Sequence, residues 1–205
     1  MELNQALQEI RKTEKRGFDQ SIDLIVNLKG VDIKRDNIST IITLPNKVKD
    51  KRVCGFLSAK SDLVSTITQP EFAKYKDPKE LKRLVKGFDF FIAGAKLMPS
   101  VATTFGKALG PTGKMPSPQL GVLMQEEPAA IKQLLARIDV SVKIRVKEPS
   151  IKVSVGKESM SDEKLTANIL ALYRGIVAAL PTKQENVRSV LLKLTMGAPL
   201  KVEIK

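Results

Sequence analysis

The segment Val187–Ile204, VRSVLLKLTMGAPLKVEI, carries two apolar runs on either side of a short turn. The first run, Val187 to Met196, is typical of a β-strand, and the alternating Leu200, Val202 and Ile204 predict a second strand. Gly197 stands between them, directly before Ala198-Pro199, and we expect it to adopt a positive φ. The C-terminal end is therefore predicted to be two strands joined by a tight turn at Thr195-Met196-Gly197.

The segments at both ends of the chain supply the other parts of a small domain. Upstream lie a strand pattern around Ile151–Val155 and a helix pattern over Asp162–Leu180, which begins after Ser161. At the other end, an amphipathic helix over Glu2–Arg16 precedes two strand-like runs, Ile22–Leu28 and Ile38–Leu44, which we expect to pair. Neither terminal piece has enough apolar surface to fold alone. If they pair, residues 1–59 and 149–205 form one α+β domain built from both termini.

The middle of the chain, residues 60–148, has a different texture. Together with the strand-like run Val53–Ala59 before it, this region alternates between short apolar runs and helical segments. Strand patterns cover Phe88–Ala93 and Val140–Val146, helical patterns cover Ser61–Ile67, Pro78–Lys86, Leu97–Leu109 and Pro128–Ile138, and a loop is predicted over Gly110–Gly121. Such alternation favours a parallel sheet with helices on both faces. The middle region is therefore predicted to be an α/β domain inserted into the terminal one.

The charge of the chain points to a polyanionic partner. There are 35 Lys and Arg residues against 22 Asp and Glu residues, which gives a net charge of +13. A folded protein with this excess repels itself, and a nucleic acid relieves that repulsion. Charge that only keeps the protein soluble is the alternative. We therefore expect the protein to bind a nucleic acid, and its motifs bear on whether that is RNA or DNA.

Several chemistries are disfavoured by composition. The chain has no histidine, which removes the commonest general base and most transition-metal sites. Its single cysteine, Cys54, lies in the apolar run VCGFL, so we expect a buried thiol in a reducing compartment. The sequence shows neither a secretory leader nor an apolar run of about 18 residues. We expect a cytoplasmic protein that is not an enzyme, with no cofactor, no metal and no membrane partner.

Two other classes of function fit the motifs poorly. The segment Gly110-Pro-Thr-Gly113-Lys114 suggests a phosphate-binding loop, but two residues separate its glycines, Met115 follows the lysine, and a helix precedes it. A rigid turn with exposed Lys107 and Lys114 near a backbone phosphate is the better interpretation, so a nucleotide-binding enzyme is disfavoured. A DNA-binding regulator would need a recognition helix, and the basic N-terminal helix has few base-reading side chains.

The turn Thr195-Met196-Gly197 suits RNA in its chemistry. Its backbone amides and the threonine hydroxyl can donate to phosphate or 2′-hydroxyl oxygens. Phe18, just before the first strand, is either a core residue or an exposed aromatic that packs against ribose. Met196 has the same two interpretations. The residues alone permit RNA binding at this turn without requiring it.

Three segments of the sequence resemble a known family, the L-one proteins of the large ribosomal subunit. They are GFDQS at 17–21, LGPTGKMP at 109–116 and LTMG at 194–197, and FDFFIA at 88–93 with LMP at 97–99 is similar to the archaeal branch. The resemblance implies an α/β protein of two domains. One is an α+β terminal domain with split β-α-β architecture, and the other is an inserted, Rossmann-like, three-layer α/β domain.

The resemblance also implies partners and site residues. It implies a monomer outside the ribosome that binds large-subunit rRNA at the mobile stalk near the tRNA exit site, with its own mRNA and exit-site tRNA as further partners. Through its own mRNA the protein would repress translation. The positions that match the family's RNA-contacting surface are Phe18, Ser21, Ser189, Thr195, Met196 and Gly197, with Lys152, Gly156 and Lys157 as weaker candidates.

Overall fold

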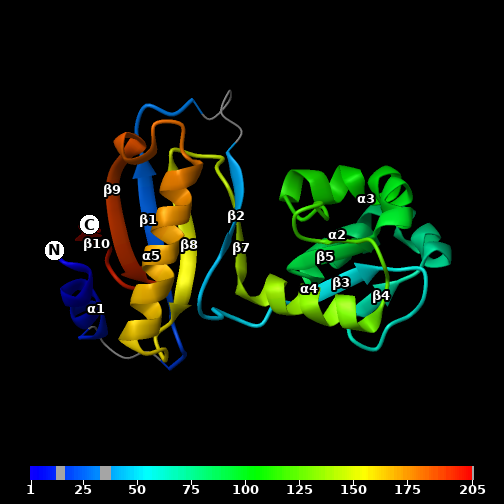
Figure 1. The fold of residues 1–205 in the computed structure, drawn as a ribbon, viewed down its shortest axis with the longest axis horizontal. Coiled ribbons are helices and arrows are strands. Elements are labelled where there is room, and N and C mark those ends of the chain that lie inside the picture. The colour runs from blue at the N-terminus through cyan, green and yellow to red at the C-terminus, as the bar shows by residue number, and fades with distance from the viewer. Residues whose placement is uncertain (13–16, 33–37, 205) are drawn as a thin grey trace. The chain divides into compact units, whose positions relative to one another are not determined.

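A computed structural model describes residues 1–12, 17–32 and 38–204 (Figure 1). The chain forms two compact units, one made of Met1–Lys49 with Val140–Lys205 and the other of Asp50–Asp139. The N-terminal helix α1, predicted over Glu2–Arg16, spans Leu3–Arg11, and the predicted positions 13–16 lie outside the described residues. The α/β fold class predicted from the sequence is confirmed.

The first unit is organised around a four-stranded antiparallel sheet in the order β10-β9-β1-β8. Strand β1, Ser21–Leu28, comes from the N-terminal end of the chain. Its neighbours β8, Ser150–Lys157, and β9, Val187–Leu194, come from the C-terminal end, as does β10, Leu200–Val202. Figure 1 shows the blue β1 enclosed between the yellow β8 and the red-brown β9. Neither end of the chain therefore makes this sheet without the other.

Helices cover one face of this sheet. Alternate residues of β1 are buried from Ile22 to Leu28, and α5, Asp162–Ala179, meets them with a buried stripe at helical spacing. The stripe consists of Leu165, Ile169, Leu172 and Ile176. Ala6, Leu7 and Ile10 of α1 join the same core. Each fully buried leucine or isoleucine contributes roughly 1.5–3 kcal/mol, so this face holds the terminal segments together.

A separate ribbon of two strands packs against α5. It consists of β2, Ser39–Thr43, paired antiparallel with β7, Ser141–Arg145. The expected pairing of Ile22–Leu28 with Ile38–Leu44 is therefore wrong. Ile42 of β2 instead lies so close to Gly175 of α5 that a Cβ at position 175 would come within 2.6 Å of it. Alternating burial shows that a segment is a strand, but it does not identify the strand's partner.

The second unit has a parallel sheet in the order β4-β3-β5-β6. Its strands are β3, Val53–Phe56, β4, Ser65–Ile67, β5, Phe90–Gly94, and β6, Val122–Leu123. Its helices are η1, Gln69–Lys76, α2, Pro78–Gly87, η2, Ala95–Leu97, α3, Met98–Thr112, and α4, Pro128–Val140. Figure 1 shows α3 and α4 on opposite sides of the strands. Phe56, Phe72, Phe91 and Phe105 form the aromatic centre on the α3 side.

Two details of the sequence-based prediction are corrected in this region. The boundaries after residues 59 and 148 assigned Val53–Phe56 to the terminal part and Ser141–Arg145 to the inserted part, whereas β3 pairs with β4 and β5, and β7 pairs with β2. The helix expected over Ser61–Ile67 is a turn followed by the strand β4. A short apolar run next to Ser and Thr does not distinguish the two structures.

Candidate nucleic-acid interface

The turn Thr195-Met196-Gly197 is tied to the N-terminal segment that precedes β1. The Thr195 amide donates to the carbonyl oxygen of Ser21 at 3.0 Å, and the Thr195 hydroxyl donates to the same oxygen at 3.1 Å. The Ser21 amide donates to Thr195 Oγ1 at 3.2 Å, and the Met196 amide donates to Oε1 of Gln20 at 3.3 Å. Residues from the two ends of the chain therefore build this turn together.

These bonds change which groups the turn offers to a ligand. The amides of Thr195, Met196 and Gly197 and the threonine hydroxyl all donate within the protein, the Gly197 amide to Leu194 at 3.1 Å. The expectation that they donate to RNA is therefore corrected. In a continued antiparallel ladder the Ser21 amide would bond the Thr195 carbonyl, but here it takes Oγ1 instead. Within the described part of the chain, no donor reaches the carbonyl oxygens of Thr195 or Met196.

Gly197 does not have the expected positive φ, which among the described glycines occurs only at 30, 113 and 121. A Cβ at position 197 would lie 3.2 Å from Cβ of Leu194. The turn thus needs a small residue here because it approaches the end of β9 closely. The predicted positive φ at Gly197 is therefore wrong, and the structure shows a close approach to Leu194 in its place.

Two apolar side chains stand exposed beside this turn. Phe18 is 55% exposed and Met196 is 66% exposed, which excludes the core interpretation for both. Gln20, whose Oε1 accepts the hydrogen bond from the Met196 amide, is only 2% exposed. A hollow of about 270 Å³ flanks the turn between α1 and Leu200. Exposed apolar groups beside free carbonyl oxygens suit a ligand with both apolar faces and hydroxyl donors.

The loop that follows β8 completes this end of the sheet. Asp19 accepts hydrogen bonds from Oγ and N of Ser159 at 2.9 and 3.1 Å, and Lys157 lies 3.5 Å from its carboxylate. The hydroxyl of Ser159, followed by its amide and by Lys157, holds the pKa of Asp19 below its ordinary value against the opposing effect of burial. The predicted site residue Lys157 is therefore already paired in the unbound protein.

Arg11 fixes this loop to α1. Its Nε donates to Oδ1 of Asp162 at 2.7 Å, and its other nitrogens donate to the carbonyl oxygens of Glu158 at 3.0 Å and Met160 at 2.6 Å. Asp162 also begins α5, where a carboxylate interacts favourably with the helix dipole. One guanidinium thus joins the N-terminal helix to the segment that holds Asp19.

The face of the sheet opposite α1 and α5 carries the other predicted residues. We call it the open face, and it consists of Asp23, Ile25, Asn27, Ser150, Lys152, Ser154, Ser189, Leu191 and Lys193. None of these is fully buried, and the described core does not include them. Ser189 accepts a hydrogen bond from Asn27 at 3.0 Å, and Lys152 lies 3.8 Å from Glu148. Ser189 is six residues from Thr195 on β9, or about 20 Å, so the predicted residues outline a surface rather than a pocket.

Asp23 is a carboxylate in the middle of the open face. Partial burial raises its pKa, while Lys193 on β9 and a hydrogen bond with Ser154 on β8 act in the opposite direction. The sequence analysis did not select Asp23, Ile25 or Gln20. Alternation along Ser21–Leu28 would have placed the first two on the outer face, but nothing local marks Gln20 as a buried bridge.

Gly156 does not belong to this surface. It faces the core, where a Cβ would come within 2.5 Å of Cδ2 of Leu165 and 2.9 Å of the sulfur of Met160. Its place in the candidate site is therefore structural.

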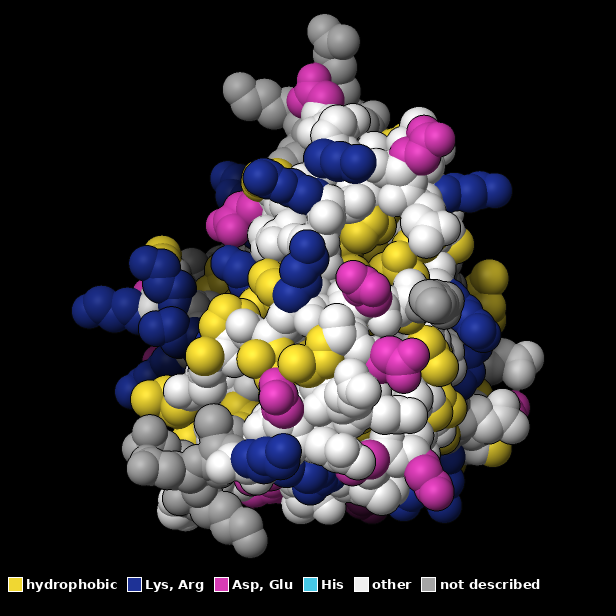
Figure 2. All heavy atoms as spheres, turned by 90° about the vertical axis from the view of Figure 1, so that its left-hand side faces the viewer, with side chains coloured by type: hydrophobic (Ala, Val, Ile, Leu, Met, Phe, Trp, Pro, Cys, Tyr) yellow, Lys and Arg dark blue, Asp and Glu magenta, His cyan; other side chains and the backbone are white. Residues whose placement is uncertain are grey.

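Figure 2 views the first unit from the side of β10 and α1, and Lys and Arg side chains are scattered there among apolar and acidic ones.

The Gly- and Pro-rich segment of the second unit was predicted to be a loop over Gly110–Gly121, but its first residues are helical. Helix α3 continues to Thr112 and ends at Gly113, whose φ of 74° is left-handed. Lys107 is exposed as expected, but Nζ of Lys114 donates to the carbonyl oxygens of Val85 and Phe88, both at 2.7 Å. These carbonyls lie at the C-terminal end of α2, where a cation is favoured. Lys114 is thus an internal cap and not the exposed phosphate contact that we expected.

The described residues contain no cluster of three or more side chains suited to a metal ion. Cys54 is fully buried, and burial raises the pKa of its thiol to about 12, as expected for a core cysteine. No described helix combines the length and the apolar character needed to cross a bilayer.

Comparison with known proteins identifies the family of the chain. Residues 10–198 match the Ribosomal protein L1p/L10e family. The chain belongs to this family. Relatives named large ribosomal subunit protein uL1 include those of Pyrococcus horikoshii, 33% identical over 94% of this chain and 90% of the relative, and Methanococcus voltae, 36% identical over 97% and 96%. That of Thermofilum pendens is 34% identical over 98% of this chain and 92% of its own length.

Membership in the L1p/L10e family confirms the resemblance seen in the three sequence segments, including its archaeal character. Proteins of this family are structural components of the ribosome and not enzymes, and the family match covers residues 10–198 of this chain. The match includes all three motifs, from Phe18 to Gly197.

Proposed function

We propose that the chain is a structural constituent of the large ribosomal subunit in the cytoplasm, and that its first unit binds large-subunit rRNA. The observation that carries this proposal is the turn at 195–197, held by Gln20 and Ser21, with no described donor at the carbonyl oxygens of residues 195 and 196 and with the side chains of Met196 and Phe18 exposed. The names of the relatives support the same conclusion. The unit built from both termini is the RNA-binding domain of this proposal, and Asp50–Asp139 is the inserted domain.

The mechanism of this proposal is recognition of shape and of ribose. The carbonyl oxygens of Thr195 and Met196 accept hydrogen bonds from 2′-hydroxyl groups, which DNA lacks. Phe18 and Met196 pack against sugar and backbone. Ser21, Ser189, Lys152 and Lys157 supply polar contacts along the open face and its end. The net charge of +13 adds affinity that falls as salt concentration rises.

Finer parts of the proposal rest on the resemblance to the family. They are a position at the mobile stalk near the tRNA exit site, binding of the protein's own mRNA with repression of translation, and contact with exit-site tRNA. In this proposal the inserted domain approaches RNA through Lys107, which is exposed on α3. Lys114 is excluded because it caps α2.

A double substitution tests the site. Thr195→Val with Met196→Asp should weaken binding of an rRNA fragment roughly tenfold or more, because it removes the two hydrogen bonds of the Thr195 hydroxyl with Ser21 and places a negative charge beside RNA. Met124→Asp is the matched control, since Met124 is 86% exposed in the second unit. Affinity is measured by fluorescence anisotropy over a salt series, with duplex DNA of equal length as competitor.

A folded double variant that keeps wild-type affinity would show that the assigned surface is wrong. Equal binding of RNA and duplex DNA would reject the RNA-specific proposal altogether. The repressor role is tested separately, by translating the protein's own mRNA in vitro with added protein. Repression by wild type and not by the double variant is expected.

A further inference from the structure

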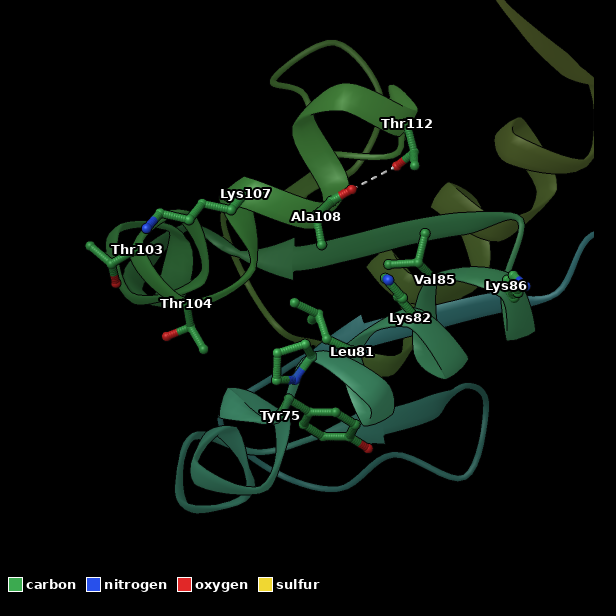
Figure 3. Close-up of a pocket in the computed structure, with 11 residues that line it drawn as sticks. Tyr75, Leu81, Lys82, Val85, Lys86, Thr103, Thr104, Lys107, Ala108 and Thr112 are labelled. Atoms are coloured by element: carbon green, nitrogen blue, oxygen red, sulfur yellow. Dashed lines mark hydrogen bonds between the residues drawn. The ribbon is translucent and has the colours of Figure 1, made fainter.

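A groove runs between α2 and α3 of the second unit (Figure 3). Its volume is about 980 Å³. On α2 it is lined by Pro78, Lys82 and Lys86 at intervals of four and by Leu81 and Val85 beside them. On α3 the same spacing appears in Thr104, Ala108 and Thr112. Two parallel stripes, one on each helix, therefore form its walls.

The floor and the rim of the groove differ in chemistry. Leu81 and Ala108 point into the space between the helices, and Val85 and Tyr75 extend the apolar floor (Figure 3). Lys82 and Lys86 on one side and Lys107 on the other are exposed at the rim. No hydrogen bond or ion pair of these three lysines is found in the described part of the chain, and no described Asp or Glu lines the groove.

We propose that this groove binds an acidic, amphipathic helix of a partner protein. Two ridges at a spacing of four residues are the surface on which a third helix packs, with its own apolar residues between them. Helix α2 has ten residues and a length of about 15 Å, so the groove accommodates roughly three turns of a partner. The lysines on both sides match acidic residues on the flanks of that helix.

The lining favours a protein segment over RNA. Unstacked bases are bound on aromatic faces, and the floor is mostly aliphatic, with Tyr75 as its only aromatic among the described residues. The hydroxyl of Thr112 donates to the carbonyl oxygens of Ala108 and Leu109 at 3.1 and 3.0 Å, so it is occupied within α3. Lysines around an aliphatic floor suit carboxylates that flank leucine or isoleucine side chains.

The test uses two synthetic helical peptides about three turns long and the full-length protein. Both carry leucines at intervals of three and four, and their flanks are glutamate in one peptide and lysine in the other. The glutamate peptide should bind wild type, measured by fluorescence anisotropy. Lys82→Glu with Lys86→Glu should weaken it roughly tenfold and should bring the lysine peptide to measurable affinity.

Lys79→Glu with Lys132→Glu is the control, because it lowers the net charge equally at exposed sites that do not line the groove. It should leave glutamate-peptide binding within about twofold of wild type. The proposal is overturned if the glutamate peptide does not bind, if both charge variants weaken it equally, or if polyuridylate displaces it from the groove with higher affinity. The last result would assign the groove to RNA. The rRNA fragment should bind the Lys82 and Lys86 variant as tightly as it binds the equally charged Lys79 and Lys132 control, which separates this proposal from the site on the first unit.

Discussion

Replacing Thr195 by valine separates the structural part of the turn from its part in RNA binding. The hydroxyl makes two hydrogen bonds to Ser21, at 3.2 and 3.1 Å, and valine keeps the shape of the side chain without them. A neutral hydrogen bond contributes about 0.5–1.5 kcal/mol net, toward the lower end at an exposed site. Thr195→Val should therefore lower the free energy of unfolding by about 1 kcal/mol.

The effect on RNA follows from the backbone. Without Oγ1, the Ser21 amide takes the carbonyl oxygen of residue 195 as an ordinary ladder would, and that oxygen is lost to the ligand. One lost hydrogen bond of about 1 kcal/mol weakens RNA binding roughly fivefold. Binding of a 2′-deoxy version of the same fragment should not change, because it has no hydroxyl to donate.

Urea unfolding and anisotropy titrations with both fragments measure these quantities. Thr195→Ser is the matched control, since it retains the hydroxyl and should behave nearly as wild type. The reasoning is refuted if the valine variant is folded and binds RNA as wild type does. It is also refuted if the affinities for the ribose and deoxyribose fragments fall equally, because the carbonyl would then have no role.

Three further substitutions test the open face, the core behind it and, as a control, helix α3 of the second unit. Burial raises the pKa of Asp23, so folding favours its protonated form, and stability falls as pH rises from the ordinary value of 3.8 through the raised pKa. Asp23→Asn should therefore be more stable than wild type at neutral pH and bind RNA more tightly. The difference in stability should vanish below pH 3.8, the ordinary pKa of aspartate. Urea unfolding across pH measures it, and a difference that does not change with pH would contradict the reasoning. Gly156→Ala should cost roughly 1–3 kcal/mol because its Cβ meets Leu165 and Met160. Gly106→Ala, a helical position with nothing within 4 Å, should instead gain about 0.5–1 kcal/mol, and equal thermal shifts in the two variants would contradict the packing argument.

Local patterns in the sequence predicted most elements but not how the strands associate. Alternation over Ser21–Leu28 and Val187–Leu194 correctly marked two strands, because their inner residues meet one face of a core. The same property also marked Ser39–Thr43, but it did not identify the partner, since β2 pairs with β7, which lies about a hundred residues further along the chain. Strand partners depend on the core as a whole.

The candidate site shows the same division. The sequence left open whether Phe18 and Met196 are core residues or exposed ones, and the structure shows that both side chains are exposed. The amides of the turn and the Thr195 hydroxyl were predicted to donate to a ligand. In the structure those of Thr195 and Met196 donate to Ser21 and Gln20 instead. Lys114 was predicted as a surface cation for a similar reason. Long-range hydrogen bonds to backbone groups leave no mark on either partner's neighbours in sequence.

The position of β1 between β8 and β9 has a consequence for how the protein is made. The segment Ser21–Leu28 leaves the translating ribosome early, and its two neighbours follow only after more than a hundred further residues. The second unit is continuous in sequence and can fold while synthesis proceeds. The surface proposed to bind RNA therefore forms only after Leu194 and Thr195 have emerged, so a chain that terminates before them should not bind at this site.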